Sequence, residues 1–223
     1  MCFDLIVFDL DGTLIDSKLD LALSVNATRK NAGMSPLDHE LIYSYVGNGA
    51  TTLIRRSLGP EVSQKQVRLA LNFFYDYYRD HMLDNTVLYP GVHQVLDLLL
   101  DAKRIMSILT NKPVRFSNLL IDRLGLKDHF QSIYGGNSFR SKKPDPYGLN
   151  QLITELGVSK ERTLMVGDSS VDIETAQNAG VASCGVTYGL QPETLTVNPP
   201  EVLLDEIREL VNIIHDGIPT SAS

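Results

Sequence analysis

The sequence predicts an α/β fold, with a Rossmann-like three-layer core around a mainly parallel sheet and an inserted α-helical domain. Three observations indicate this class. A mostly apolar stretch at residues 3–8 has the composition of a buried strand. Helical patterns without an intervening strand follow as far as residue 88, and from residue 89 onward helical and strand patterns alternate regularly. We therefore expect an α/β core formed by residues 1–15 and 89–223, and a helical insertion formed by residues 16–88.

Two helices are indicated within the insertion. Apolar residues at helical spacing over 19–27 indicate the first, which ends near Gly33, a residue suited to a helix C-terminus. Apolar and aromatic residues at helical spacing over 63–83 indicate the second, and Ser63 is suited to begin it as the N-cap. The aromatic residues of this second helix are expected to pack inside a helical bundle.

A glycine-rich segment, Gly47-Asn48-Gly49, lies between these helices. It resembles the start of a dinucleotide-binding fingerprint, but the third glycine of that fingerprint would fall at position 52, which is Thr. We therefore expect a loop between helices, and such a loop can still contact a ligand.

The alternating pattern after residue 89 predicts which residues of the core form strands and which form helices. Strands are predicted at residues 104–111, 132–134, 163–168 and 181–186. Helices are predicted at residues 92–102, 114–125, 145–157, 171–180 and 200–214. The C-terminal tail, residues 219–223, is expected to be frayed.

Polar residues end several of these strands, and in open α/β sheets ligands bind beyond the carboxyl ends of the strands. Asp9 and Asp11 lie two residues apart after the first strand, so both face one side, and Gly12 lets the backbone approach a ligand closely. Two carboxylates held together are normally tolerated only where a metal ion absorbs the charge or one acid keeps its proton. The other polar residues at this edge are Thr110, Asn111, Lys143, Asp168 and Asp172. Acids for Mg²⁺, a nucleophile, a hydroxyl donor and a cation are the parts of a phosphoryl-transfer site.

Other interpretations of these residues differ in how well they fit. Residues 9–13 taken alone also fit a surface turn, because Asp and Gly favour turns. A calcium-binding loop requires Gly at its sixth position and Glu at its twelfth, where this chain has Leu14 and Asp20. A signalling receiver domain, a non-catalytic phospho-acceptor module, has similar acids with Thr and Lys on a parallel sheet, but it lacks a helical insertion after its first strand. A structural role would leave the clustered acids unexplained.

Length, net charge and the distribution of apolar residues argue against several classes of function. A chain of 223 residues with 43% apolar residues can form one to two domains. The formal net charge of −7 disfavours nucleic-acid binding. No apolar run reaches the roughly 18 residues of a membrane span, and the N-terminus lacks the basic region of a signal peptide, so a cytoplasmic location and no membrane partner are expected. Cys2 and Cys184 are expected to be reduced thiols, and none of the five histidines lies at the spacing of a metal motif.

The candidate residues resemble the four ordered motifs of the haloacid dehalogenase-like superfamily. These motifs are 9–13 (Asp-Leu-Asp-Gly-Thr), Thr110-Asn111, Lys143-Pro144 and 167–172 (Gly-Asp-Ser-Ser-Val-Asp), and they span almost the whole chain. The insertion is similar to the helical cap of that superfamily. Within that superfamily, the chain most resembles the phosphoglycolate phosphatase group. The resemblance lies in residues 45–49, in Arg55-Arg56, and in Lys112 directly after Thr110-Asn111.

The resemblance implies a Mg²⁺-dependent phosphatase that acts through an aspartyl-phosphate. Asp9 would be the nucleophile, and Asp11 would protonate the leaving oxygen and then take a proton from water. Mg²⁺ would be held by Asp9, Asp168 and the backbone carbonyl of Asp11, with Asp172 orienting ligands or bound water. The presence of Asp11 favours a phosphate substrate over a halide, since halide leaves without needing a proton.

The resemblance also implies how the substrate is bound. Thr110 and the Asn111 amide would bind phosphoryl oxygens, and Lys143 would neutralise their charge. We prefer Lys143 to Lys142 because Lys143 directly precedes the proline of the family pattern. The remainder of the substrate would be read by the cap, through Gly47, Asn48, Gly49 and either Arg55 or Arg56.

The substrate implied is a small phosphorylated metabolite, 2-phosphoglycolate. Pyrophosphatase-like and β-phosphoglucomutase-like members of the superfamily share all four motifs, so both activities stay open at this stage. The sequence leaves the choice between a monomer and a homodimer open as well.

Overall fold

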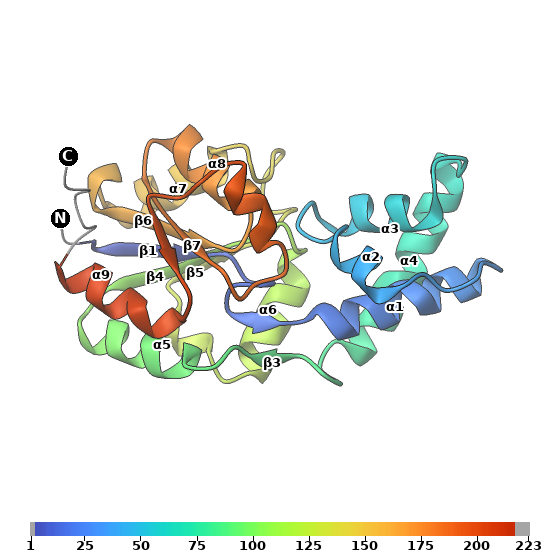
Figure 1. The fold of residues 1–223 in the computed structure, drawn as a ribbon, viewed down its shortest axis with the longest axis horizontal. Coiled ribbons are helices and arrows are strands. Elements are labelled where there is room, and N and C mark those ends of the chain that lie inside the picture. The colour runs from blue at the N-terminus through green and yellow to red at the C-terminus, as the bar shows by residue number, and fades with distance from the viewer. Residues whose placement is uncertain (1–2, 217–223) are drawn as a thin grey trace.

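The computed structural model describes residues 3–216, so Cys2 and the predicted frayed tail lie outside the described residues. A six-stranded parallel sheet forms the centre of the core (Figure 1). In spatial order its strands are β5 (Ser132–Tyr134), β4 (Ile105–Leu109), β1 (Leu5–Phe8), β6 (Thr163–Gly167), β7 (Ala182–Val186) and β8 (Val202–Leu204). Phe8 is in register with Ile108 of β4 and Val166 of β6, so these three central strands end at one edge of the sheet.

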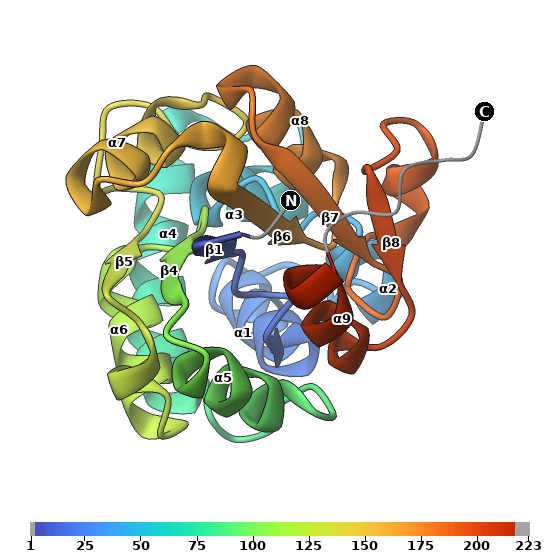
Figure 2. The same cartoon turned by 90° about the vertical axis from the view of Figure 1, so that its left-hand side faces the viewer.

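Helices cover both faces of the sheet because successive side chains of β1 point to opposite faces. Ile6 and Phe8 belong to the hydrophobic core shared with α5, α6 and α9, whereas Leu5 and Val7 belong to the core shared with α7 and α8. Figure 2 shows these two helical layers on either side of the sheet. The helices are α5 (Val92–Asp101), α6 (Val114–Arg123), α7 (Tyr147–Leu156), α8 (Ser170–Ala179) and α9 (Leu210–Asp216), and short 3₁₀ helices lie at η1 (Lys127–His129), η2 (Lys160–Arg162), η3 (Pro192–Thr196) and η4 (Ile207–Glu209).

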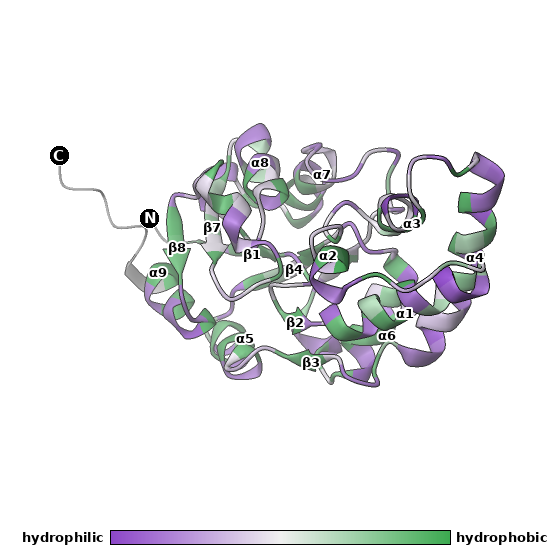
Figure 3. Cartoon of the chain, turned by 45° about the vertical axis from the view of Figure 1, so that its right-hand side comes forward, coloured by the Kyte–Doolittle hydropathy of each residue, from purple (hydrophilic) through white to green (hydrophobic). Residues whose placement is uncertain are grey.

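Between its two short end strands, the secondary structure of the insertion is helical, and the insertion projects from one end of the core (Figure 1). Its helices are α1 (Lys18–Asn31), α2 (His39–Tyr43), α3 (Ala50–Leu58) and α4 (Gln64–His81). The N-terminus of α4 lies where the sequence predicts it, because Ser63 and Gln66 form a capping box. The cap helices carry both hydrophobic and hydrophilic residues, as expected for helices that bury one face (Figure 3).

Both connections between the core and the helical insertion run through one small ribbon. Strand β2 (Ile15–Asp16) pairs antiparallel with β3 (Val87–Leu88). The domain division predicted after residues 15 and 88 falls at this ribbon. The two-residue strands are too short to show a sequence period of their own, so the sequence pattern does not predict them.

Asp20 fixes the returning chain against α1. Its buried carboxylate accepts hydrogen bonds from the backbone N–H groups of Asn85 and Thr86 and from both of their side chains, at 2.8–3.0 Å. We expect Asp20→Ala to lower the free energy of unfolding by about 3 kcal/mol, because it leaves several donors without their charged acceptor. Urea unfolding monitored by circular dichroism measures this loss. Asp84→Ala, at an exposed acid of the same segment, is the control and should change stability by less than about 0.5 kcal/mol. Equal losses in both variants would contradict the assignment.

The predicted helix over 200–214 is wrong in its first part. Val202–Leu204 is instead β8, which pairs in parallel with β7 and buries Leu204 against the core. Helix α9 begins only at Leu210. An apolar triplet beside an open sheet edge gains backbone hydrogen bonds as a strand, and residues 202–204 are too few for their periodicity to distinguish the two states. None of the helices within residues 3–216 is both long and apolar enough to cross a membrane.

Candidate active site

A cavity of about 50 Å³ lies between the carboxyl edge of the sheet and the helical insertion. Most of the residues that the sequence predicts for the site line it. These are Asp9, Asp11, Gly47, Gly49, Thr110, Asn111, Lys143, Asp168 and Asp172. The ends of β1, β4 and β6 bring together Asp9, Asp11, Thr110, Asn111 and Asp168, as the parallel order of those strands requires. Lys143 comes from the segment before α7, and Asp172 comes from α8.

Lys143 lies at the centre of the acidic cluster and is almost fully buried. Its Nζ is 2.7 Å from Asp9 Oδ1 and 2.6 Å from Asp172 Oδ1. Burial alone would lower the pKa of Lys143, but the two carboxylates outweigh it and raise that pKa above its ordinary value. Lys143 therefore stays an ammonium ion that orients Asp9. Lys142, the alternative considered from sequence, donates instead to the Asn48 backbone carbonyl at the rim.

The carboxylates of the cavity outnumber its ammonium groups. Burial raises the pKa of Asp9 to about 6, and repulsion from Asp172 and Asp11 adds to this effect against the opposing attraction of Lys143. Burial and the neighbouring acids also raise the pKa of Asp168. Among the described lining residues, four carboxylates face two ammonium groups, those of Lys143 and Lys112. With all four carboxylates ionised, these groups sum to a formal charge of −2, which one divalent cation would neutralise.

The donor set fits Mg²⁺, and it distinguishes the two acids near β6. Asp9, Asp168 and Asp172 each offer a carboxylate oxygen within 4.8 Å of the others. Both oxygens of Asp172 are taken, one by Lys143 and the other by the N–H and hydroxyl of Ser169. Asp168 Oδ2 accepts the N–H groups of residues 190 and 191, whereas Oδ1 has, among the described residues, only the Thr13 hydroxyl at 3.4 Å. Asp168 Oδ1 is thus open to a metal ion, while Asp172 is placed to orient Lys143.

Two glycines make room for the Asp168 carboxylate. A Cβ atom on Gly12 would lie 2.2 Å from Asp168 Oδ2, and one on Gly189 would lie 2.2 Å from Asp168 Cβ. Gly12 also has a φ of +89°, which other residues rarely adopt. The close approach that Gly12 is predicted to allow is therefore an approach by Asp168, a residue of the neighbouring strand end.

Lys112 is a prominent site residue for which the sequence motifs predict no role. Its Nζ donates to both carboxylate oxygens of Asp11, at 2.9 and 3.0 Å, and to the hydroxyl of Tyr78 on α4, at 2.7 Å. Burial would lower the pKa of Lys112, but Asp11 and Tyr78 raise it above its ordinary value. Ser17 also holds Asp11, with its hydroxyl 2.5 Å from Asp11 Oδ1. The position of Lys112 directly after Thr110-Asn111 is the sequence signal that points to it.

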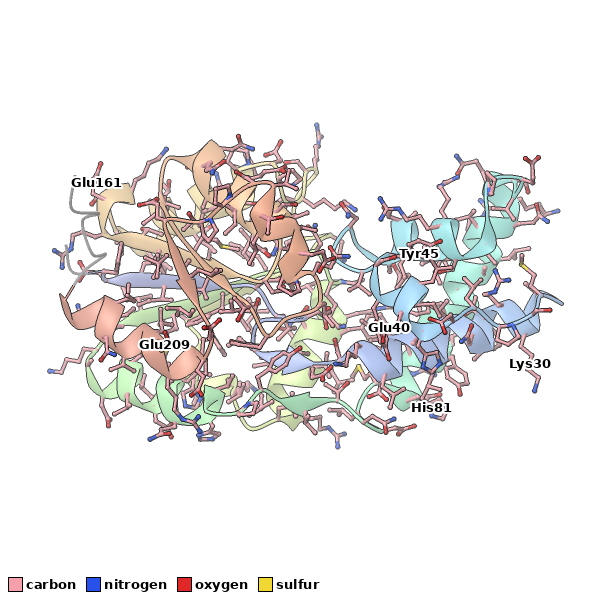
Figure 4. All side chains as sticks on the ribbon, in the orientation of Figure 1. Lys30, Glu40, Tyr45, His81, Glu161 and Glu209 are labelled. Carbon is pink, nitrogen blue, oxygen red and sulfur yellow. The ribbon has the colours of Figure 1, made fainter. Side chains whose placement is uncertain are left out.

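The glycine-containing loop of the cap is fastened to the core from two sides. Gln191 Nε2 donates to the backbone carbonyls of Tyr43, Ser44 and Val46, at 3.0–3.4 Å. Asn111 Nδ2 donates to the carbonyls of Gly47 and Lys143, at 2.9 and 3.0 Å. Tyr45, labelled in Figure 4, marks this loop on the cap side. The loop thus closes the cavity, with Gly47 and Gly49 in its lining and Asn48 at its rim.

We expect Gln191→Leu to raise KM about tenfold, with a smaller change in kcat, because three loop carbonyls lose the donor that holds the cap closed. Steady-state kinetics on the preferred substrate measures this change. Gln177→Leu is the matched control, since Gln177 is exposed on α8 and bonds to Asn198. A Gln191 variant with the KM of the wild type would show that closure does not depend on this side chain.

The structure does not bring Arg55 or Arg56 to the cavity. The Arg55 guanidinium donates to Gln64 Oε1 at 3.0 Å in an exposed position, and Arg56 is exposed on α3. Helix α3 instead turns Leu53 toward the cavity. Sequence position alone could not show which side of this helix faces the core.

Known proteins are similar to this chain over most of its length. The family model described as haloacid dehalogenase-like hydrolase matches residues 6–186. A phosphoglycolate phosphatase of Chromobacterium violaceum is 37% identical over 216 residues, which cover 95% of this chain and 96% of the relative. A phosphoglycolate phosphatase of Vibrio cholerae is 38% identical over 219 residues, covering 94% and 96%.

Solved structures show the same fold. A crystal structure described as a predicted phosphoglycolate phosphatase from Haemophilus somnus superimposes with a TM-score of 0.90 at 31% identity, covering 95% of this chain and 97% of that one. With the match over 6–186, the chain belongs to the haloacid dehalogenase-like hydrolases.

Proposed function

We propose that the chain is a Mg²⁺-dependent phosphatase that hydrolyses 2-phosphoglycolate through an aspartyl-phosphate on Asp9. The observation that carries this proposal is the placement of two carboxylates, Asp9 and Asp11, on one small cavity with different partners. Asp9 is oriented by Lys143, and Asp11 is held by Ser17 and Lys112. Because their partners differ, we assign the two acids different roles: Asp9 is the nucleophile, and Asp11 is the proton donor and acceptor.

In the first step Asp9 attacks phosphorus, and the bond from phosphorus to the ester oxygen breaks. Asp11 gives a proton to that leaving oxygen, so glycolate departs as an alcohol. Thr110 Oγ1 accepts the N–H of Lys112 at 3.3 Å, which leaves its own hydrogen to donate to a phosphoryl oxygen. Lys143 offsets the charge of the phosphoryl group against Asp9.

In the second step water attacks the aspartyl-phosphate. Asp11, now ionised, takes a proton from that water, and the bond from phosphorus to Asp9 breaks to release inorganic phosphate. Asp9, Asp168 and the Asp11 backbone carbonyl would hold Mg²⁺, which would supply positive charge that lets an anionic nucleophile and an anionic phosphate approach each other.

The size of the cavity supports a small substrate. A volume of about 50 Å³ is room for a few water-sized groups, and the walls toward the cap are formed by apolar and aromatic side chains of Leu53, Phe74, Tyr75 and Phe116. A hexose ring would require the cap to stay open. The names of the relatives reported above point to the same substrate, and for such a metabolite we propose a cytoplasmic site of action.

The test is a substrate panel with the purified protein, in Mg²⁺ and in EDTA. We expect kcat/KM for 2-phosphoglycolate to exceed that for pyrophosphate and for glucose phosphates by at least about tenfold, and the activity to be lost in EDTA. A preference for pyrophosphate or for a sugar phosphate would overturn the proposed substrate. Transfer of the phosphoryl group to a sugar rather than to water would overturn the hydrolase assignment.

A further inference from the structure

The cavity contains a second cation, Lys112, which contacts the proton-transferring acid Asp11 and not the nucleophile Asp9. Among the described lining residues, the ammonium groups are those of Lys143 and Lys112. Lys143 is engaged by Asp9 and Asp172, and Lys112 is engaged by Asp11 and the Tyr78 hydroxyl. Lys112 lies on the cap side, where the neighbouring walls are aromatic or aliphatic. A substrate carboxylate enclosed by such walls requires a cation or several donors, because an unpaired charge is costly in an apolar environment.

The position of Lys112 matches the length of a short acid. Lys112 Nζ contacts both oxygens of Asp11, and Asp11 is the group that protonates the ester oxygen of the substrate. In 2-phosphoglycolate one methylene separates this ester oxygen from the carboxylate carbon. A cation in direct contact with Asp11 therefore lies within reach of the carboxylate while phosphorus remains at Asp9.

Tyr78 supplies a second donor at the same place. Its hydroxyl accepts a hydrogen bond from Lys112, and no described residue accepts the hydrogen of that hydroxyl. Burial raises the pKa of Tyr78 to about 12, so the group keeps its proton at neutral pH. Phe74 and Phe116 hold the ring in place, with centroids 5.5 and 5.4 Å away.

We propose that Lys112 and the Tyr78 hydroxyl form the subsite for the substrate's carboxylate. This inference rests on the proposed function and replaces Arg55 and Arg56 as the expected readers of that group. Because Lys112 follows β4 of the core and Tyr78 lies on α4 of the cap, a carboxylate bound here would bridge the two units. Binding of the substrate's carboxylate and closure of the cap then occur together. A phosphate ester that lacks the carboxylate forms a weaker closed complex.

The test compares two substrates that differ at one group. Ethylene glycol monophosphate carries a hydroxymethyl group where 2-phosphoglycolate carries its carboxylate. In Lys112→Met, we expect kcat/KM for 2-phosphoglycolate to fall roughly thirtyfold more than kcat/KM for ethylene glycol monophosphate. Tyr78→Phe, which keeps the ammonium group, should give a selective loss in the same direction of about threefold to tenfold. Equal losses on both substrates in Lys112→Met would mean that Lys112 serves only Asp11, and would overturn the inference.

Two further measurements test whether the selective loss is specific to Lys112 and whether it is a loss of substrate binding. Lys142→Met removes the neighbouring cation at the cavity rim and should not change the ratio between the two substrates. In an Asp9→Asn background, which has no nucleophile, calorimetry with Mg²⁺ measures binding of 2-phosphoglycolate without turnover. The added Lys112→Met change should weaken that binding at least about tenfold, and unchanged binding would contradict the subsite. If the wild type itself does not prefer 2-phosphoglycolate, the proposed function fails, independently of the result for Lys112.

Discussion

Replacing Asp9 with asparagine is expected to lower kcat by at least about 10⁴-fold while the protein remains folded, because the amide cannot form the aspartyl-phosphate. The substitution is nearly isosteric, and Lys143 retains Asp172 as a partner at 2.6 Å. Single-turnover and steady-state phosphate release measure the loss, and circular dichroism verifies the fold. Asp4→Asn, at the amino end of the same strand, is the control and should retain activity. A turnover within tenfold of the wild type in a folded Asp9 variant would exclude Asp9 as the nucleophile.

The same variant has a second expected effect, on stability without metal. Asp9 has a pKa of about 6 in the folded protein against a reference value of 3.8, so its ionised form is disfavoured by folding. As pH rises from about 4 to 6, the unfolded state loses this proton before the folded state does, and the stability of the metal-free protein falls by up to about 3 kcal/mol. Asparagine does not titrate. In EDTA, Asp9→Asn should therefore melt above the wild type near pH 8, and the difference should close near pH 4.

Much of the core could be predicted because its signals are local. The apolar run before Asp9 and the alternation after residue 89 indicate the strands, and parallel strands bring their polar ends to one edge. Asp9, Asp11, Thr110 and Asp168 therefore meet as expected. The helical insertion follows from helical periodicity unbroken by a strand.

The features that escaped prediction depend on contacts between distant segments. Strand β8 is a strand because β7 offers it an edge, and the triplet at 202–204 carries no such information by itself. Lys112 becomes a site residue through Tyr78, which is 34 positions away in sequence. Gln191 acts through backbone carbonyls of the cap loop, which have no side-chain signature. The resemblance implies a role for Arg55 or Arg56, but the direction of a side chain from α3 is set by which face packs against α4.

Metal removal is expected to abolish activity, and Asp168→Ala is expected to weaken Mg²⁺ activation at least about tenfold more than Asp172→Ala does. The reason lies in the hydrogen bonds of the two acids. Asp172 already satisfies Lys143 and Ser169 with its two oxygens, so its loss disturbs Lys143 first and the metal only indirectly. Asp168 keeps Oδ1 nearly free beside Asp9, so its loss removes a ligand.

The two variants are a matched pair, since each truncates one buried aspartate near the end of β6. Titration of activity with Mg²⁺ after EDTA treatment gives the activation constants. The rise in melting temperature on adding Mg²⁺ gives a readout independent of turnover, because a ligand that binds only the folded state stabilises it. We expect that rise to disappear in Asp168→Ala and to persist in Asp172→Ala. A rate unchanged by chelation would exclude the metal altogether, and a melting shift lost only in the Asp172 variant would reverse the two roles.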